Sequence, residues 1–333
     1  MILVTGATGL VGAHLLLRLL EKKQAVRAIY RNSSSIAKTK VLFEKHNQLT
    51  LFEQIEWIQA DITDLPRLEI AFQEINQVYH CAGLISFDPS DEEKLRKINI
   101  EGTANVVNLC LAFGVQKLCF VSSISTIGAA LLHSMPCDES CEWNPELPHT
   151  DYAISKYGAE MEIWRGYQEG LAVVLVNPGV ILGPYFWESG SGELFAKVAQ
   201  KFPFYSSGST GFIGVTDVVH TMIQLMESAI SGERYILISE NKTYEAVLKE
   251  IAQAMNSSIR WMAIRKWMVS LAWRLDALAG ILLGKKRVLS KQLAQTLFES
   301  TSYTSEKIKK ELGMAFSPIN QVIQETASDY LKA

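Results

Sequence analysis

The sequence has few features that would indicate a disulfide framework, a metal site or a nucleic-acid surface. Its five cysteines are odd in number and form no Cys-x-x-Cys pair, so we expect reduced thiols in a cytoplasmic protein. No His-Glu-x-x-His motif or carboxylate cluster indicates a metal. The formal net charge of -3 offers no general attraction for a phosphate backbone, which argues against nucleic acid as a partner.

A signal peptide and a membrane span are also missing from the pattern. We expect the first strand to begin at Met1, which leaves no room for a signal peptide. The most apolar late segment, 261–283, contains four charged side chains, Arg265, Lys266, Arg274 and Asp276. These charges predict an amphipathic helix or helix pair rather than a span. Its tryptophans would also suit a membrane surface, but the favoured interpretation is a face buried over a substrate cavity.

The first half of the chain alternates short β-branched runs with longer helical patterns. Strands are expected at 2–5, 25–30, 57–58, 78–80, 118–121 and 172–176, and helices at 12–22, 98–113 and 152–168. Strands that alternate with helices form parallel sheets covered on both faces. We therefore predict an α/β fold, a Rossmann-type doubly wound parallel sheet with a smaller, mostly helical C-terminal lobe.

The pattern changes after Pro178. Gly, Pro and Ser cluster at 179–214, which predicts long loops around one helix at 193–201. A strand near 235–239 is expected to return to the main sheet, and the pattern from 243 onward is mainly helical. Asp217 is expected to cap the helix that follows it. The predicted domains are residues 1–177 for the dinucleotide and 178–333 for the substrate.

A glycine-rich segment lies between the first strand and the first helix, and it predicts a dinucleotide site. Gly6 would allow a tight turn, Gly9 would let the backbone approach a pyrophosphate, and Gly12 would let helix and strand pack closely. The free N–H groups at the start of the helix would then face the phosphates. The spacing is Gly-x-x-Gly-x-x-Gly, and its position between strand and helix is what makes the signal specific.

The end of the second strand indicates which nicotinamide cofactor is bound. An acidic residue there would bind the ribose 2′-hydroxyl of NAD, whereas an arginine accommodates the 2′-phosphate of NADP. Arg31 and Asn32 follow Tyr30, and no carboxylate is present. We therefore expect NADP(H) ahead of NAD(H), with a solvated surface arginine as the simpler alternative.

Two later strand ends extend the expected cofactor site. Asp61 follows the third strand and could accept a hydrogen bond from the adenine amino group, whereas Asp64, just before Leu65-Pro66, is expected to cap a helix. Ala82 and Gly83 follow the fourth strand and would let the backbone approach the cofactor.

Tyr152 and Lys156 lie one helical turn apart and are the predicted proton-transfer pair. A tyrosine has an ordinary pKa of about 10, and a nearby ammonium would favour the phenolate and bring the pKa toward the working range. Such a spacing is common in ordinary helices, where the tyrosine packs and the lysine extends to solvent.

Ser122 and Ser123 strengthen the prediction because they end the fifth strand, where ligands bind in an open α/β sheet. We expect the Ser123 hydroxyl to donate to a substrate carbonyl, with Ser122 pointing the other way. No Gly-x-Ser-x-Gly motif surrounds Ser123, which argues against a hydrolase nucleophile. His80 lies in an apolar strand and is interpreted as a core histidine.

Together these motifs resemble the extended short-chain dehydrogenase/reductase (NAD-dependent epimerase/dehydratase) family, from residue 1 to about 332. The matching segments, in the family's order, are 5–12, Asp61, 99–103, 121–123 and 152–156. The resemblance implies a Ser123–Tyr152–Lys156 catalytic set and a homodimer built on a four-helix bundle. Further expected cofactor contacts are Thr5, Thr8, Leu10, Val11, Ile62, Cys81, Asn99, Val121, Asn177, Pro178, Gly179 and Val180.

Within the family, segments 176–184 and 138–141 are similar to the dihydroflavonol reductase and cinnamoyl-CoA reductase branch. Nucleotide-sugar epimerases usually have Arg where Asn177 stands and Asn where Val180 stands. Sugar dehydratases have an acidic pair where Ile124 and Ser125 follow Ser123. The first hypothesis is thus an NADP(H)-dependent reductase of a carbonyl or alcohol substrate. A nucleotide-sugar epimerase with the same catalytic set is the second, and a non-catalytic NADP(H)-binding sensor is the third.

The substrate itself is not encoded in any motif. Loops around Phe87, 185–193 and 205–212 are expected to shape its pocket. The candidate substrate contacts are Ile85, Phe87, Ser125, Tyr185 and Phe212.

Overall fold

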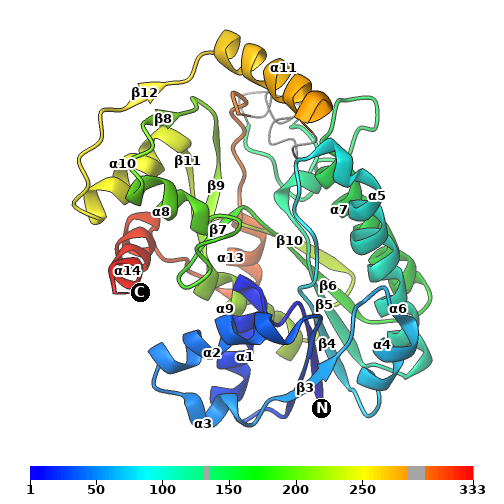
Figure 1. The fold of residues 1–333 in the computed structure, drawn as a ribbon. Helices are drawn as coiled ribbons and strands as arrows, with labels where there is room; N and C mark the ends of the chain where they lie inside the picture. Colours follow the sequence, from blue (N-terminus) through cyan, green and yellow to red (C-terminus); the bar gives the residue numbers. More distant parts are fainter. Residues whose placement is uncertain (131–134, 284–296, 333) are drawn as a thin grey trace.

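The computed structural model describes residues 1–130, 135–283 and 297–332. Its centre is a seven-stranded parallel sheet with the strand order β10-β6-β5-β4-β1-β2-β3 (Figure 1). The strands are β1 (Ile2–Thr5), β2 (Val26–Tyr30), β3 (Glu56–Gln59), β4 (Gln77–His80), β5 (Lys117–Val121), β6 (Val173–Pro178) and β10 (Glu233–Leu237). The α/β class and the doubly wound parallel sheet are therefore confirmed.

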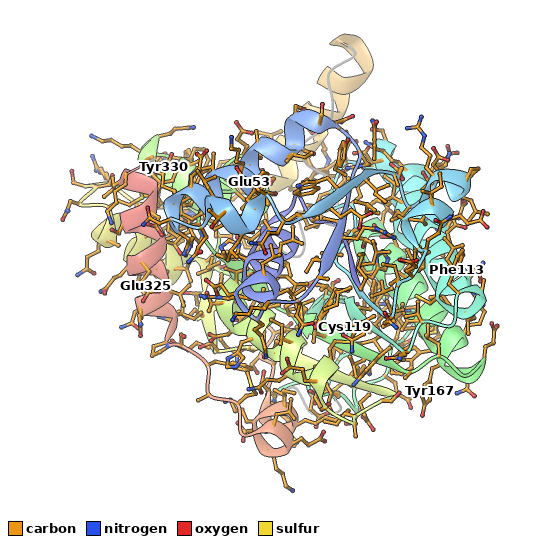
Figure 2. The ribbon with its side chains drawn as sticks, turned by 90° about the horizontal axis from the view of Figure 1, so that it is seen from below. Glu53, Phe113, Cys119, Tyr167, Glu325 and Tyr330 are labelled. Carbon is orange, nitrogen blue, oxygen red and sulfur yellow. The ribbon has the colours of Figure 1, made fainter. Side chains whose placement is uncertain are left out.

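Alternate residues of the strands supply two separate cores, one on each face of the sheet. Leu118 and Phe120 face one core, and Cys119 between them faces the other, as the period-two geometry of a strand requires. Helices α1 (Leu10–Glu21) and α9 (Val215–Glu227) cover the Cys119 face. Helices α4 (Leu65–Ala71), α6 (Gly102–Ala112) and α7 (Asp151–Gln168) cover the opposite face. In Figure 2, Cys119 accordingly lies between the flank carrying Phe113 and Tyr167 and the flank carrying Glu325 and Tyr330.

The predicted helix at 98–113 is two elements rather than one. A π-helical segment, Arg96–Glu101, continues the short helix α5 (Glu92–Leu95) and runs into α6. Gly102 follows the π-helical segment. A side chain would be crowded at this position, because a Cβ there would lie 2.6 Å from the Ile62 side chain. The smaller helices α2 (Ile36–Lys45) and α3 (Leu49–Phe52) lie between β2 and β3.

The segment 179–214 is more ordered than the predicted loops. Besides α8 (Gly192–Ala199), it contains three strands, β7 (Val180–Leu182), β8 (Phe204–Tyr205) and β9 (Ser209–Gly214). β9 pairs with β7 and with β11 (Glu240–Thr243) in a three-stranded sheet, and β8 pairs with β12 (Met262–Ala263). The loop prediction was wrong here because these short strands are stabilised by partners distant in the chain rather than by a local pattern.

The remainder of the chain is mainly helical, with α10 (Tyr244–Ala254), α11 (Lys266–Leu283), α13 (Glu306–Leu312) and α14 (Ile319–Leu331). A third core joins β7 and β9 to α8, α10 and α14. β10 lies between these elements in the chain, yet it pairs with β6 at the edge of the main sheet. The division at residue 177 stays a prediction. Among the described helices, none has both the length and the hydropathy that crossing a bilayer requires.

Asp217 does not cap the helix that follows it. It lies inside α9, whose N-cap is Gly214, and its carboxylate accepts a 2.9 Å hydrogen bond from the Ser317 amide. This hydrogen bond links the segment before α14 to α9. The helix begins three residues earlier than the sequence pattern indicated, with Gly214 rather than Asp217 as its N-cap.

Candidate active site

The turn between β1 and α1 brings the three glycines together. Gly6 has a φ of +66°, and a Cβ there would lie 2.6 Å from the Ala82 nitrogen, so only glycine fits. A Cβ on Gly12 would clash with the Gly6 carbonyl oxygen. Gly9 is the N-cap of α1, and its amide donates to the Gly6 oxygen over 3.0 Å. The glycines therefore allow the helix to start directly against the end of the strand.

The first turn of α1 fits a phosphate group. No described side chain caps it, and it contains no acidic residue. Its amide groups thus have the unsatisfied donors and the positive dipole end that bind anions. Thr5, by contrast, is buried, and its hydroxyl contacts His80 Nδ1 at 2.6 Å and accepts from the Ala82 amide at 3.2 Å. Thr5 therefore positions the end of β4 rather than presenting a free hydroxyl.

The ends of β2 and β3 form a depression of about 400 Å³ on the same edge of the sheet. Arg31, Asn32, Asp61 and Arg67 are among the residues that line it. The Arg31 guanidinium is 3.9 Å from the Asp61 carboxylate, and the Arg31 side chain is 62% exposed. The predicted cofactor residues therefore lie together, and Arg31 remains accessible to an incoming anion.

Arg67 is a second cation at this depression that the sequence analysis did not identify. It lies in the first turn of α4, with its Nε 3.6 Å from the Asp64 carboxylate. Asp64 is the N-cap residue of α4, as predicted, although its side chain accepts no capping hydrogen bond. The sequence did contain a signal for Arg67, since it is a cation three residues after Asp64. Residues at this spacing lie on the same side of a helix.

The segment after β4 lies close to two other predicted residues. A Cβ on Gly83 would lie 3.4 Å from Asn99 Oδ1 and 3.8 Å from Lys156 Nζ. The Asn99 amide is already engaged, because Oδ1 accepts from the Leu84 amide at 2.7 Å and Nδ2 donates to Ser155 at 2.8 Å. Asn99 thus ties the 83–84 backbone to α7, which is a different role from the direct cofactor contact that we predicted.

Ser123, Tyr152 and Lys156 meet at the carboxyl ends of β5 and β6. Ser123 follows β5; its side chain lies near enough to the Tyr152 phenol to lower the pKa of that group, and its hydroxyl accepts from the Ser125 amide at 3.1 Å. α7 starts at Asp151 because Thr150 caps it through the Ala153 amide. Lys156 lies one turn further on, and its ammonium donates to the Val121 carbonyl at 2.9 Å. The three side chains of the predicted catalytic set are thus in one place.

The pKa of Tyr152 is raised, whereas we expected Lys156 to lower it. Burial raises it to about 12, and the hydrogen bond with Ser123 opposes this rise. The Lys156 ammonium is directed at Val121 instead of lowering the tyrosine pKa. Burial also lowers the pKa of Lys156 to about 8, although the charge of Glu160 raises it. At neutral pH, Tyr152 is therefore a neutral phenol and Lys156 is mostly a cation.

Ser122 and Ser125 flank Ser123 in different ways. Ser122 is 5% exposed, and its hydroxyl oxygen is buried without a described partner, consistent with a side chain that leaves the site. The Ser125 hydroxyl oxygen also has no described hydrogen-bond partner. His80 is fully buried with its pKa lowered to about 3 by that burial, as a core histidine would be.

A buried polar network lies behind the candidate catalytic set. Asn177 is fully buried, and its Nδ2 donates to the Ser123 carbonyl at 3.1 Å and to Glu160 Oε1 at 2.6 Å. Glu160 is also fully buried, and it accepts from Thr126 Oγ1 at 2.6 Å and faces Arg234 at 3.6 Å. Asn177 therefore positions Ser123, which differs from the predicted cofactor contact. Sequence reasoning overlooked Glu160, whose only signal was its place one turn after Lys156.

The predicted substrate contacts separate into two groups. Phe87 lies edge-on to the Tyr152 ring at 6.0 Å and is 39% exposed, and Ile85 is 59% exposed. Phe212 is completely buried in the core of the C-terminal lobe, packed against Tyr244 at 5.9 Å, so it has no surface to offer a substrate. Tyr185 packs near His46 and Trp187 rather than near Tyr152. Of these side chains, Phe87 contacts the Tyr152 ring.

Among the described residues, no group of three or more His, Cys, Asp or Glu side chains is arranged to hold a metal ion. The five cysteines are free thiols.

The chain is similar to known proteins in sequence and in fold. The model of the NAD dependent epimerase/dehydratase family matches residues 2–237. Over 331 residues the chain is 28% identical to a Synechocystis sp. protein named as a dihydroflavonol 4-reductase, covering 97% of this chain and 92% of the relative. It is 29% identical over 249 residues to Sterol demethylase protein B of Methylococcus capsulatus, covering 74% and 72%. The structure of UDP-glucose 4-epimerase from Thermus thermophilus in complex with NAD is similar in fold, with a TM-score of 0.76, 19% identity, and coverage of 100% of this chain and 99% of that one.

Proposed function

The chain belongs to the NAD dependent epimerase/dehydratase family, and we propose that it reduces an apolar carbonyl compound with NADPH. The observation that carries the proposal is the buried Tyr152 phenol near Ser123 at the carboxyl edge of the sheet, protonated at neutral pH. A protonated tyrosine is ready to give a proton to a carbonyl oxygen. This is the direction of proton transfer that reduction requires.

The cofactor would occupy the edge formed by the ends of β1 to β5. The uncapped start of α1 suits its pyrophosphate, and the Gly83 backbone leaves room near Lys156 for its nicotinamide end. Arg31 and Arg67 offer positive charge where the adenosine ribose would lie, which favours a 2′-phosphate and hence NADP(H).

A bound reduced nicotinamide supplies a hydride to the carbonyl carbon. In this proposal the Ser123 hydroxyl donates a hydrogen bond to the carbonyl oxygen, and the Tyr152 O–H transfers its proton to that oxygen to give the alcohol. The Lys156 ammonium then stabilises the phenolate that remains until a solvent proton restores Tyr152. Ser125 has an unpartnered hydroxyl next to Ser123 and is a candidate second donor to the substrate.

The surroundings of Tyr152 support an apolar substrate. Phe87 and Ile85 expose apolar surface on the segment beside the phenol ring. The names of two relatives refer to a dihydroflavonol and to a sterol, both of which are ring systems with extensive apolar surface. Residue 177 is Asn and residue 180 is Val, so the pattern usual in nucleotide-sugar epimerases is missing.

The proposal can be tested with a panel of ring-containing ketones and aldehydes, following the absorbance of reduced cofactor. We expect consumption of NADPH with at least one apolar carbonyl compound. Tyr152→Phe should lower kcat/KM by about a thousandfold, within the range that a positioned acid contributes, while NADPH fluorescence titrations stay unchanged. Turnover that survives this substitution would rule out the role given to Tyr152.

The second candidate is a nucleotide-sugar epimerase, favoured by the fold shared with UDP-glucose 4-epimerase. An epimerase regenerates its cofactor in each cycle and so gives no net consumption. Mass spectrometry of the purified protein for retained cofactor, combined with a UDP-sugar interconversion assay, separates the two candidates. Interconversion without cofactor consumption would replace the reductase proposal.

A further inference from the structure

Helix α11 has large apolar side chains on two opposite faces. On one face Val269 is 5% exposed and Trp273 is half-buried, four residues apart. On the other, Trp267 is 62% exposed and Leu271 is 52% exposed, also four residues apart. A helix at the surface of a protein in water normally carries polar residues on its outer face. The outer face of α11 therefore has the composition of a contact surface.

The same segment is strongly basic in a chain of net negative charge. Residues 257–276 contain four cations, Arg260, Arg265, Lys266 and Arg274, against one acidic residue, Asp276, whereas the whole chain carries a net charge of -3. In the described part of the chain, no ion pair joins Arg260, Arg265 or Lys266 to an acidic side chain. The Arg274 guanidinium lies 4.7 Å from the Trp273 ring. These charges are thus available to an anionic partner.

Apolar and basic side chains continue onto the strands that precede α11. Phe202 and Met262 are each 45% exposed, and β12 with Met262 pairs with β8, which begins two residues after Phe202. Lys201 is exposed beside them. Figure 1 shows β8, β12 and α11 at the same end of the molecule. We name this surface the α11 face; it comprises Phe202, Met262, Trp267 and Leu271 with Lys201, Arg260, Arg265, Lys266 and Arg274.

We infer that the α11 face docks on the surface of a bilayer that contains anionic phospholipid. Tryptophan and other large apolar side chains enter the boundary between headgroups and acyl chains, while Lys and Arg contact the anionic headgroups. α11 would lie in the plane of the membrane surface and not cross it. This inference goes beyond the proposed reaction, and it gives a lipid-dissolved substrate a direct route to the enzyme.

A second copy of the chain fits the α11 face less well than a bilayer does. In an isologous dimer the same patch faces itself, so the cations of one copy would meet those of the other. Residues 257–276 supply one acidic side chain, Asp276, against four cations. Juxtaposed like charges oppose association. Anionic lipid supplies the missing negative charge and the apolar environment at once.

The test is co-sedimentation of the full chain with vesicles of phosphatidylcholine alone and of phosphatidylcholine mixed with phosphatidylglycerol. We expect binding to the mixed vesicles, little binding to phosphatidylcholine alone, and loss of binding at high salt. The double variant Arg265→Glu with Lys266→Glu should weaken binding to the mixed vesicles at least about tenfold. Trp267→Ser with Leu271→Ser should weaken it as well, and should also abolish the blue shift of tryptophan fluorescence on binding.

The matched control is Lys40→Glu with Lys45→Glu on α2, which changes the net charge by the same amount at the far end of the molecule. This control should bind vesicles as the wild type does. NADPH titration and thermal unfolding verify that each variant is folded. Equal binding by the control and the Arg265/Lys266 variant would overturn the inference, as would no binding of the wild type to mixed vesicles. A change in oligomeric state on altering Trp267 and Leu271, without vesicle binding, would assign the face to a second copy instead. None of these readouts depends on turnover, so they can fail independently of the proposed function.

Discussion

Two helices of equal length, α7 and α11, are stabilised in opposite ways. Each has 18 residues. α7 buries polar side chains, among them Ser155, Lys156 and Glu160, and each is held by a specific partner or charge. α11 instead exposes large apolar side chains. The buried surface of α7 positions chemical groups, whereas α11 presents apolar side chains that are exposed in the described part of the chain.

The difference has a physical reason. A buried polar group is costly unless it is paired, so a network such as that of Glu160, Asn177 and Thr126 fixes one geometry. An exposed apolar side chain imposes no such geometry and can be replaced at little cost to folding. We therefore expect substitutions in α7 to affect stability and catalysis strongly, and substitutions in the outer face of α11 to affect neither.

The largest expected effect is on stability. Glu160→Leu removes the carboxylate that accepts from Thr126 and Asn177 and faces Arg234. Because it takes the carboxylate away from the Arg234 guanidinium and removes one acceptor from two buried donors, we expect the free energy of unfolding to fall by about 3 kcal/mol or more. Urea denaturation followed by circular dichroism measures it. A loss below about 1 kcal/mol would mean that the network contributes little to folding.

One variant in each helix gives a matched pair with smaller expected effects on stability. Ile163→Ala in α7 opens a cavity at a fully buried position and should cost about 3 kcal/mol or somewhat less. Trp267→Ser with Leu271→Ser in α11 should change the free energy of unfolding by no more than about 0.5 kcal/mol, because both side chains are mostly in water. Equal losses from the two variants would remove the contrast between the helices.

The pH dependence of turnover should report on Lys156. Its pKa is about 8, so the ammonium is present below that pH and is lost as the pH rises through it. We expect kcat/KM for carbonyl reduction to fall above about pH 8. Glu160→Gln keeps a hydrogen-bond acceptor but removes the charge that raises the Lys156 pKa, so the fall should begin about one pH unit lower. An unshifted profile would show that Glu160 acts on structure alone.

The smallest effect concerns cofactor choice at the opposite end of the site. Arg31→Glu should raise the Kd for NADPH about tenfold, equivalent to about 1.4 kcal/mol, with little change for NADH. Arg67→Ala tests whether the second cation of the depression shares the role. Arg18→Glu, on the exposed end of α1, serves as the control for charge alone. Fluorescence titration with both cofactors measures the preference, and an unchanged ratio for Arg31→Glu would refute the assignment.

The local pattern predicted the central sheet well because β-branched runs and glycine turns act over a few residues. Gly6 and Gly12 were identified from spacing, and the structure shows the backbone contacts that exclude any side chain there. Tyr152 and Lys156 were identified because their spacing in the sequence corresponds to one helical turn. The three short strands in 179–214 were missed, since each is stabilised by a strand distant in the chain and carries little signal of its own.

Roles that depend on burial were harder to predict. Phe212 and Tyr185 were expected near the substrate because they lie in loop-like sequence. Phe212 is instead buried in the core of the C-terminal lobe, and Tyr185 packs against the core of the main sheet beside His46. Asn99 and Asn177 were expected to contact the cofactor, and instead their amides hold other parts of the site in place. A sequence shows which hydrogen-bonding groups exist, but not which partners are within reach.

The sequence by itself determined the fold class, the glycine turn and the residues of the candidate catalytic set, because these follow from local periodicity and backbone sterics. Only the tertiary structure decided the protonation of Tyr152, the buried network around Glu160 and the exposure of α11. Each of these depends on how far water is excluded from a group, and that depends on segments far apart in the chain packing together.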